Sequence, residues 1–198
     1  RVPSAFQNEG DLVFLLGTTR NEIGASHYLS VIHQLKIGLP PRLDLDREAA
    51  LGKLILGLAE QKVLVSCHDL SEGGLAAALA ECCMRSPQHH GAVIDQLDMV
   101  LQNGLGPHAH ATGEDQKLRT DALYFGESQS RMVVTVNPRH KEILVHESQK
   151  LGVQVFQIGK VSGSQLRIGD RIQLSVSELS SLYERAIPES LEDRKVQS

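Results

Sequence analysis

The chain has 198 residues, of which 41% are apolar and 22% are charged, and its formal net charge is −4. This composition is ordinary for a globular protein, and the weakly acidic balance argues against a nucleic-acid-binding surface. No apolar stretch is long enough to span a membrane and no secretory signal is visible, so we expect no membrane attachment. The three cysteines form no disulfide or metal-binding framework, which favours the reducing cytoplasm.

The first hundred residues mix strands and helices. In chain order we predict a linker at 1–10, a buried strand at 11–17 and helices at 25–35 and 46–61. A second buried strand at 63–67, a helix at 75–84, and a strand with a short apolar element at 91–101 follow. The run at 11–17 is continuously apolar, which predicts a strand covered on both faces. Either Asp44 or Asp46 caps the helix at 46–61. Because the chain begins with Arg1, we expect a fragment or a processed product.

The second half opens with a polar, glycine-rich stretch. Residues 102–120 lack periodicity, so we expect a surface loop whose histidines are solvated rather than metal-bound. After this loop we predict a strand at 132–136, a helix at 138–151 and a half-exposed strand at 153–161. A hairpin at 166–174 and a last helix at 178–186 complete the chain's elements. Ser175 or Ser177 caps the last helix, Pro188 ends it, and residues 189–198 form a frayed tail.

The order of these elements bears on the fold class. Helices and strands occur together without the regular alternation of a doubly wound fold. We therefore predict an α+β fold, with a mixed β-sheet and helices mainly on one face. One domain at 11–188 accommodates every element, with the linker 1–10 before it and the tail 189–198 after it.

The turn at 68–74, with the sequence HDLSEGG, joins a buried strand to an alanine-rich helix. Ser71 can cap the helix, while Gly73 and Gly74 allow the backbone to approach a ligand or a neighbouring element closely. Free amides at this helix start are a candidate anion site. The alternative is that the glycines serve close packing only, which is the commoner role of a glycine pair taken alone.

Polar residues at two places suit ligand binding. Asp69 directly follows the buried strand, where its carboxylate either holds Mg²⁺ in a cleft or caps its own turn. Glu127, Ser128 and Gln129 offer a carboxylate, a hydroxyl and an amide, which suit a polyhydroxylated or phosphorylated small molecule. The alternative is a polar loop that enters the sheet. Arg131 is either a phosphate partner or a solvated charge.

Five stretches taken together resemble one family. They are GDLVFLLGTT, NEIGASHY, PPRLDL, HDLSEGGLA and FGESQSR, at residues 10–19, 21–28, 40–45, 68–76 and 125–131. In this order they are similar to the last domain of the small, multi-subunit form of the phosphoribosylformylglycinamidine synthase family, which belongs with aminoimidazole ribonucleotide synthetase. The resemblance spans nearly the whole chain and implies the aminoimidazole ribonucleotide synthetase C-terminal-domain-like fold.

The resemblance implies a ligase of purine biosynthesis that uses ATP, Mg²⁺ and ammonia to convert formylglycinamide ribonucleotide into its amidine. It implies that Asp69 takes the metal position of a vestigial or auxiliary site, with Glu127, Ser128 and Gln129 as its ligand residues. ATP and the catalytic residues belong to upstream domains, so we expect this chain alone to be inactive. The implied partners are those upstream domains, a glutaminase subunit and a small accessory subunit, all cytoplasmic.

One departure and two alternatives bear on this interpretation. Residues 24–28 read GASHY where the family has GGSEY, which weakens a ligand-binding role for that turn. The first alternative is a domain of a related enzyme, such as aminoimidazole ribonucleotide synthetase or selenophosphate synthetase. The second is a structural module that holds a larger enzyme together and binds no small molecule.

Overall fold

The computed structural model describes residues 1–103 and 117–196. Its centre is a mixed sheet with the strand order β2-β4-β1-β5-β3-β6-β7. The strands are β1 (Leu12–Leu16), β2 (Leu64–Asp69), β3 (Ala92–Ile94), β4 (Met132–Val136), β5 (Val155–Val161), β6 (Gln165–Ile168) and β7 (Ile172–Ser175). Neighbouring strands are antiparallel, except that β3 and β6 run parallel. The predicted α+β fold with a mixed sheet is confirmed.

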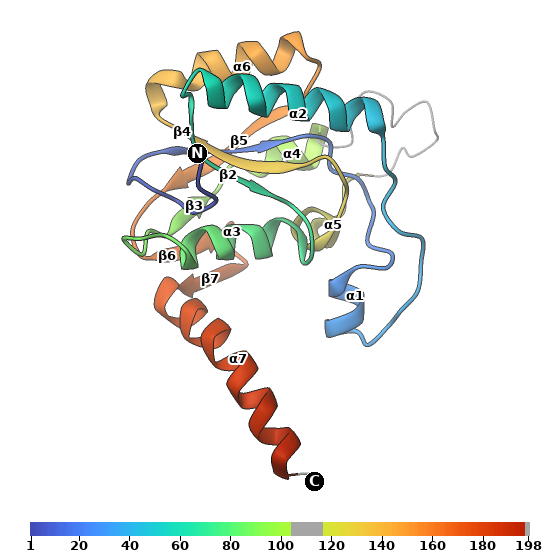
Figure 1. The fold of residues 1–198 in the computed structure, drawn as a ribbon. Coiled ribbons are helices and arrows are strands. Elements are labelled where there is room, and N and C mark those ends of the chain that lie inside the picture. The colour runs from blue at the N-terminus through green and yellow to red at the C-terminus, as the bar shows by residue number, and fades with distance from the viewer. Residues whose placement is uncertain (104–116, 197–198) are drawn as a thin grey trace.

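Helices cover both faces of this sheet (Figure 1). They are α1 (His27–Ile32), α2 (Leu45–Glu60), α3 (Gly74–Met84), α4 (Asp98–Asn103), α5 (Thr120–Phe125), the 3₁₀ turn η2 (Pro138–His140), α6 (Lys141–Lys150) and α7 (Val176–Val196). Helices α2 and α6 pack on one face, and α3 and α5 pack on the other. The prediction that helices lie mainly on one face is therefore wrong.

The central strand β1 explains why both faces need cover. Val13 and Leu15 belong to the apolar cluster that includes residues of α3, whereas Phe14 and Leu16 belong to the cluster that includes residues of α2. Successive side chains of a strand point to opposite faces, so a strand without polar residues must be buried on both. This agrees with the two-sided cover predicted for 11–17.

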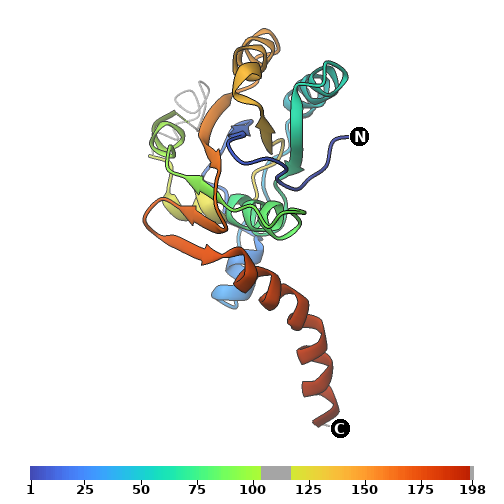
Figure 2. The ribbon, with the colours of Figure 1, turned by 90° about the vertical axis from the view of Figure 1, so that its left-hand side faces the viewer.

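The structure confirms the predicted caps of two helices and contradicts one predicted helix end. Asp44 is the cap of α2, and its carboxylate accepts a hydrogen bond from the backbone N–H of Arg47 at 3.1 Å. Ser175 caps α7 by accepting from the N–H of Glu178 at 3.1 Å. Helix α7 runs through Pro188 to Val196 and projects from the body (Figure 2), so its predicted end at Pro188 is wrong. A proline removes one helical hydrogen bond, and here the helix continues on both sides of that gap.

The ends of the predicted loop at 102–120 are helical. Helix α4 extends to Asn103, and α5, which the sequence did not predict, begins at Thr120. Residues 104–116, with His108 and His110, lie outside the described residues. Within the described part of the chain, no helix is long and apolar enough to cross a membrane.

The first residues contain no helix or strand but attach firmly to the body. Phe6 is fully buried, and its N–H donates to the carbonyl of Cys82 at 3.0 Å. All the cysteines are free. Burial raises the pKa of the Cys67 thiol to about 11 and that of the Cys83 thiol to about 12, so both are uncharged near neutral pH.

Candidate functional site

Three of the stretches that carry the family resemblance meet at one end of the sheet. Glu127 lies in the loop before β4, and one of its carboxylate oxygens, Oε1, accepts two backbone hydrogen bonds. One comes from the N–H of His27 at the start of α1, at 2.8 Å, and the other from the N–H of Gly73 at the start of α3, at 3.0 Å. We call this arrangement the Glu127 clasp. It joins three segments that lie far apart in the sequence.

The clasp ties the Glu127 carboxylate into the fold. Its side chain is 13% exposed, and the His27 ring nitrogen Nδ1 lies 3.8 Å from the same oxygen. Tyr28 stacks on Phe125, with ring centroids 4.8 Å apart and planes within 2° of parallel. Helix α1 is therefore held to the loop before β4 by a carboxylate and by an aromatic pair.

The two glycines of the β2–α3 turn allow one segment of chain to approach another. Gly73 is left-handed, with φ of 77°, and serves as the backbone cap of α3 without any side-chain hydrogen bond. A Cβ on Gly74 would lie 2.5 Å from the carbonyl oxygen of Gly126. The packing role of the glycines is thus the one that the geometry supports. Ser71 is exposed and does not cap the helix, so that prediction is wrong.

Ser128 and Arg131 are buried in the same loop. The Arg131 guanidinium donates to the carbonyls of Ser128 and Gly126, at 2.9 and 2.5 Å, and to the Thr19 hydroxyl at 3.3 Å. Burial lowers the pKa of Arg131 to about 10, against the opposing effect of nearby carboxylates, among them Glu127. Neither sequence interpretation of Arg131 holds, because this side chain orders the loop from within.

Gln129 and Asp69 are both exposed. The Gln129 side chain donates to the carbonyl of Glu127 at 3.2 Å, and it lines a cavity together with Ser128. The Asp69 side chain is 67% exposed at the end of β2, and its nearest basic group is the ring of His68 at 3.7 Å. In the described residues, no three histidine, cysteine, aspartate or glutamate side chains come together as metal ligands.

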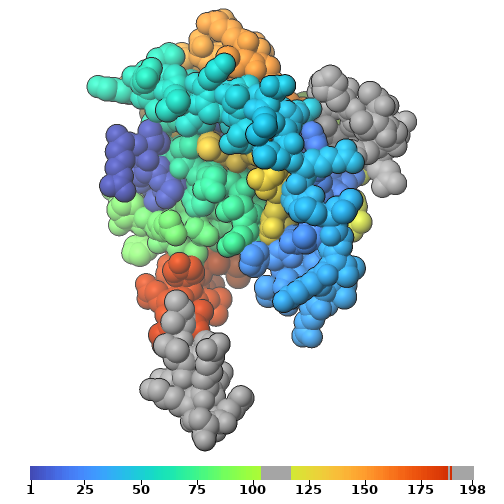
Figure 3. Space-filling model, turned by 45° about the vertical axis from the view of Figure 1, so that its right-hand side comes forward, coloured from blue at the N-terminus to red at the C-terminus, as the bar shows by residue number. Residues whose placement is uncertain are grey.

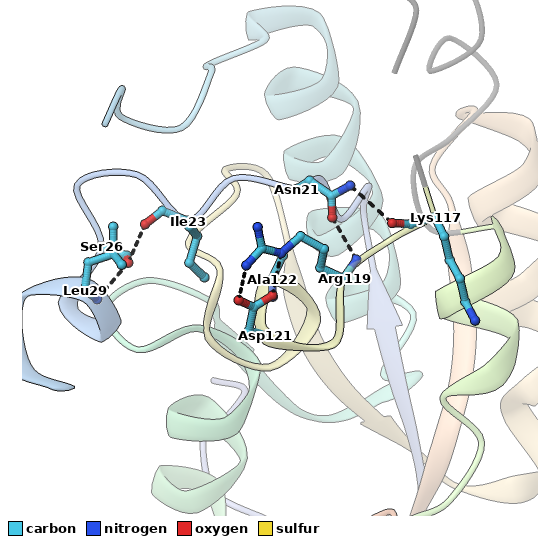
Figure 4. Close-up of polar contacts among 8 residues, drawn as sticks. All are labelled: Asn21, Ile23, Ser26, Leu29, Lys117, Arg119, Asp121 and Ala122. Atoms are coloured by element: carbon cyan, nitrogen blue, oxygen red, sulfur yellow. Dashed lines mark hydrogen bonds and ion pairs between the residues drawn. The ribbon is translucent and has the colours of Figure 1, made fainter. Parts of the chain in front are cut away.

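A second set of polar contacts, which sequence reasoning missed, lies beside α1 and α5 (Figure 4). The Asn21 side chain accepts from the N–H of Arg119 at 2.8 Å, and Arg119 forms a two-point ion pair with Asp121, at 3.0 and 2.6 Å. Hydrogen bonding to Arg119 lowers the pKa of Asp121. Ser26 caps α1 by accepting from the N–H of Leu29 at 3.3 Å. Because α5 was not predicted, no signal in the sequence linked Asn21 to residues so far along the chain.

Replacing Glu127 with alanine tests the clasp. The change leaves the amides of His27 and Gly73 without their acceptor, so we expect the free energy of unfolding to fall by about 1–2 kcal/mol. Glu127→Gln keeps an acceptor oxygen and should cost about half as much. Urea denaturation followed by circular dichroism measures both. Glu72→Ala, at an exposed position of the same turn, is the control, and an equal loss in Glu127→Ala and Glu72→Ala would contradict the clasp.

Two known proteins similar to this chain carry the same name. "Phosphoribosylformylglycinamidine synthase subunit PurL" of Thermobifida fusca is 44% identical over 193 residues, which are 95% of this chain and 22% of that protein. The protein of the same name from Anaeromyxobacter sp. (strain Fw109-5) is 35% identical over 185 residues, which are 93% of this chain and 23% of that protein. The chain thus spans less than a quarter of the length of these relatives, and the resemblance found in the sequence is confirmed.

Solved structures show the same fold at low sequence identity. "T. maritima PurL complexed with ATP" superposes with a TM-score of 0.65 at 19% identity, over 90% of this chain and 27% of that one. The E. coli hydrogenase maturation protein HypE superposes with a TM-score of 0.56 at 22% identity, over 88% of this chain and 51% of that one. The family described as "AIR synthase related protein, C-terminal domain" matches residues 8–170. The chain therefore belongs to that family.

Proposed function

We propose that this chain is a C-terminal-type domain of a phosphoribosylformylglycinamidine synthase. The whole enzyme would join ammonia, derived from glutamine, to formylglycinamide ribonucleotide in an ATP-dependent reaction that yields the amidine. The chain itself would supply no catalytic residue. The observation that carries this proposal is the 44% identity to a synthase subunit over nearly the whole chain, in a relative more than four times as long.

The proposed reaction uses ATP and Mg²⁺, which must bind somewhere in the full protein. Solved relatives are described as complexes with ATP and with AMPPCP. Among the described residues, no three metal-binding side chains come together around Asp69, and the Gly73 amide already donates to Glu127. We therefore propose that ATP and Mg²⁺ bind to other parts of the full protein.

An exposed apolar segment supports the role as one part of a larger protein. Residues 31–45 follow the first turn of α1 and return toward α2 along the surface (Figure 3, light blue). Seven large apolar side chains in this segment are between 43% and 85% exposed, namely Val31, Ile32, Leu35, Ile37, Leu39, Leu43 and Leu45. So many exposed apolar side chains within one segment favour an interaction surface. We propose that the remainder of the synthase packs here.

Further partners follow from the same proposal. One solved relative is described as PurLQS from Thermotoga maritima. We propose that the full protein assembles with a glutaminase subunit and a small accessory subunit, in the cytoplasm. A related synthetase is the less favoured assignment, because the relatives with 33–44% identity carry the name of this synthase.

The Glu127 clasp also fits the alternative that this domain is a structural module that binds no small molecule. Glu127, Gly73 and Gly74 hold segments of the chain together, and Ser71 and Asp69 are exposed. A ligand role for these residues stays a proposal. Ser128 and Gln129 line a cavity of about 380 Å³, which is large enough for a small molecule.

Two substitutions in the full-length protein test the proposed role. Leu39→Asp places a charge on the 85% exposed side chain that the remainder would cover, so we expect amidine synthesis with added ammonia to fall about ten-fold or more. Asp69→Ala should leave the rate within two-fold. The matched control is Leu56→Asp, at a 66% exposed leucine of α2, and the rate of that variant should not change. Full activity of Leu39→Asp would contradict the packing surface, and a large loss in Asp69→Ala would contradict the view that this domain holds no essential metal.

A further inference from the structure

Helix α7 leaves the body of the domain with its packing face uncovered (Figure 2). At the start of the helix Val176 is 1% exposed, and Leu179 packs against the apolar cluster that includes residues of α3. Tyr183 follows seven residues after Val176 and four after Leu179, so it lies on the same face of the helix. It is nevertheless 62% exposed, and its neighbour Leu182 is 59% exposed. The face that holds α7 to the domain therefore continues beyond the edge of the body.

The projecting part of α7 is a poor helix by itself. The helix has 21 residues, which at about 1.5 Å each span about 30 Å. Pro188 lies inside it, where a proline removes one helical hydrogen bond and crowds the preceding turn. Helices without tertiary packing are marginal in water even when no proline interrupts them. A helix of this length and sequence therefore needs contacts that the body of this domain does not supply.

The exposed apolar segment 31–45 lies on the same side of the domain as α7. Helix α1, which leads into this segment, and α7 both extend from the body next to α3 (Figure 1 and Figure 2). Residues of α7 pack with residues of α3 in one apolar cluster, and the Glu127 clasp ties the start of α1 to the start of α3. The positions of both exposed surfaces are thus fixed by the same helix, so that a single partner can contact both.

The size of the two surfaces favours such a single partner. Leu182 and Tyr183 together expose roughly 250 Å² at most, whereas each partner of a stable complex buries about 800 Å². A contact through α7 alone, such as a pair of α7 helices from two copies of the chain, therefore falls well short of a stable interface. The seven exposed apolar side chains of segment 31–45 bring the apolar area close to the size that is needed.

We propose that one apolar surface in the remainder of the synthase covers both α7 and segment 31–45. The inference rests on the proposed function, to which it adds α7 as a second docking element. The relative from Thermobifida fusca is more than four times as long as this chain, so most of the full protein is available as the partner. A partner in the same polypeptide meets this surface at an effective concentration of roughly 1 mM, which favours it over a second copy.

Cysteine alkylation in the full-length protein tests this inference. Ala186→Cys reports on α7, because Ala186 is exposed three residues after Tyr183 and its replacement leaves Tyr183 and Leu182 in place. Val31→Cys reports on segment 31–45, and Leu56→Cys on α2 is the matched control, since both side chains are 66% exposed in this chain. Each variant is treated with iodoacetamide, and mass spectrometry of its peptides separates the new thiol from the native ones. We expect the cysteines at 186 and 31 to react about ten-fold or more slowly than the one at 56.

The outcomes separate the possible occupants of this surface. Rates that do not depend on protein concentration are expected, because the partner belongs to the same polypeptide. Protection that appears only at high concentration would assign the surface to a second copy and overturn the inference. Equal rates at 186 and 56 would also overturn it, and protection at 31 would then leave the packing surface of the proposed function in place. Protection at 186 alone would show that no single surface covers both elements. Ammonia-dependent amidine synthesis by the wild type, measured separately, decides the proposed function itself.

Discussion

Replacing Arg131 with methionine is expected to lower the free energy of unfolding by about 3 kcal/mol. The guanidinium is fully buried and donates to two backbone carbonyls, those of Gly126 and Ser128, and to the Thr19 hydroxyl. Methionine fills most of the volume but leaves these buried oxygens without a donor. For a chain of this length the loss corresponds to a fall of about 6–12 °C in the thermal midpoint.

Arg131→Lys separates geometry from charge. Lysine keeps the charge but cannot donate to three acceptors in the plane of a guanidinium, so we expect it to recover less than half of the loss. Arg139→Met, in the exposed turn η2, is the matched control and should change the free energy of unfolding by less than about 0.5 kcal/mol. Differential scanning calorimetry measures all of these variants. Equal midpoints for Arg131→Met and Arg139→Met would show that Arg131 does not order the loop.

Replacing Gly74 with alanine is expected to lower the free energy of unfolding by about 2–4 kcal/mol. The residue has φ of 65°, which disfavours any side chain. The new Cβ would also lie 2.5 Å from the carbonyl oxygen of Gly126, which is backbone and cannot turn aside. Helix α3 would have to move away from the end of α5, and the Glu127 clasp would open.

The two glycines of α2 provide a control of opposite sign. Gly52 and Gly57 lie inside the helix, and a Cβ on either meets no atom within 4 Å. Alanine at each should therefore raise the free energy of unfolding by about 0.5–1 kcal/mol through helix propensity alone. Urea denaturation of the three variants gives the comparison. If Gly74→Ala were as stable as Gly52→Ala, close packing would not be the reason for the glycine.

The sequence predicts most elements of the fold because their periodicity is strong. The apolar run of β1, the capped helix α2 and the hairpin of β6 and β7 all appear as expected. The arrangement of helices on both faces was missed, although the continuous apolar run at 11–17 already implied it. Helix α5 was missed because six residues, Thr120–Phe125, are too few for a helical period to be recognised.

The contacts within the candidate site were harder to predict from the sequence than the elements of the fold. Sequence motifs identified the segments that meet, but not which contacts their side chains make. Glu127 and Arg131 look like binding groups in the sequence, yet both satisfy backbone groups of the chain itself. Arg47 and Gln154 carry no motif and were not singled out, because the cavity that they line forms only when α2 and the turn after α6 come together.

We propose that this domain completes a synthase without catalysing its reaction. The most direct test measures ammonia-dependent amidine synthesis by the remainder of the synthase, produced without this chain, before and after the purified chain is added. We expect no activity from either part alone and recovery of activity on mixing, with Leu39→Asp failing to restore it. Activity of this chain alone, or full activity of the remainder without it, would contradict the account.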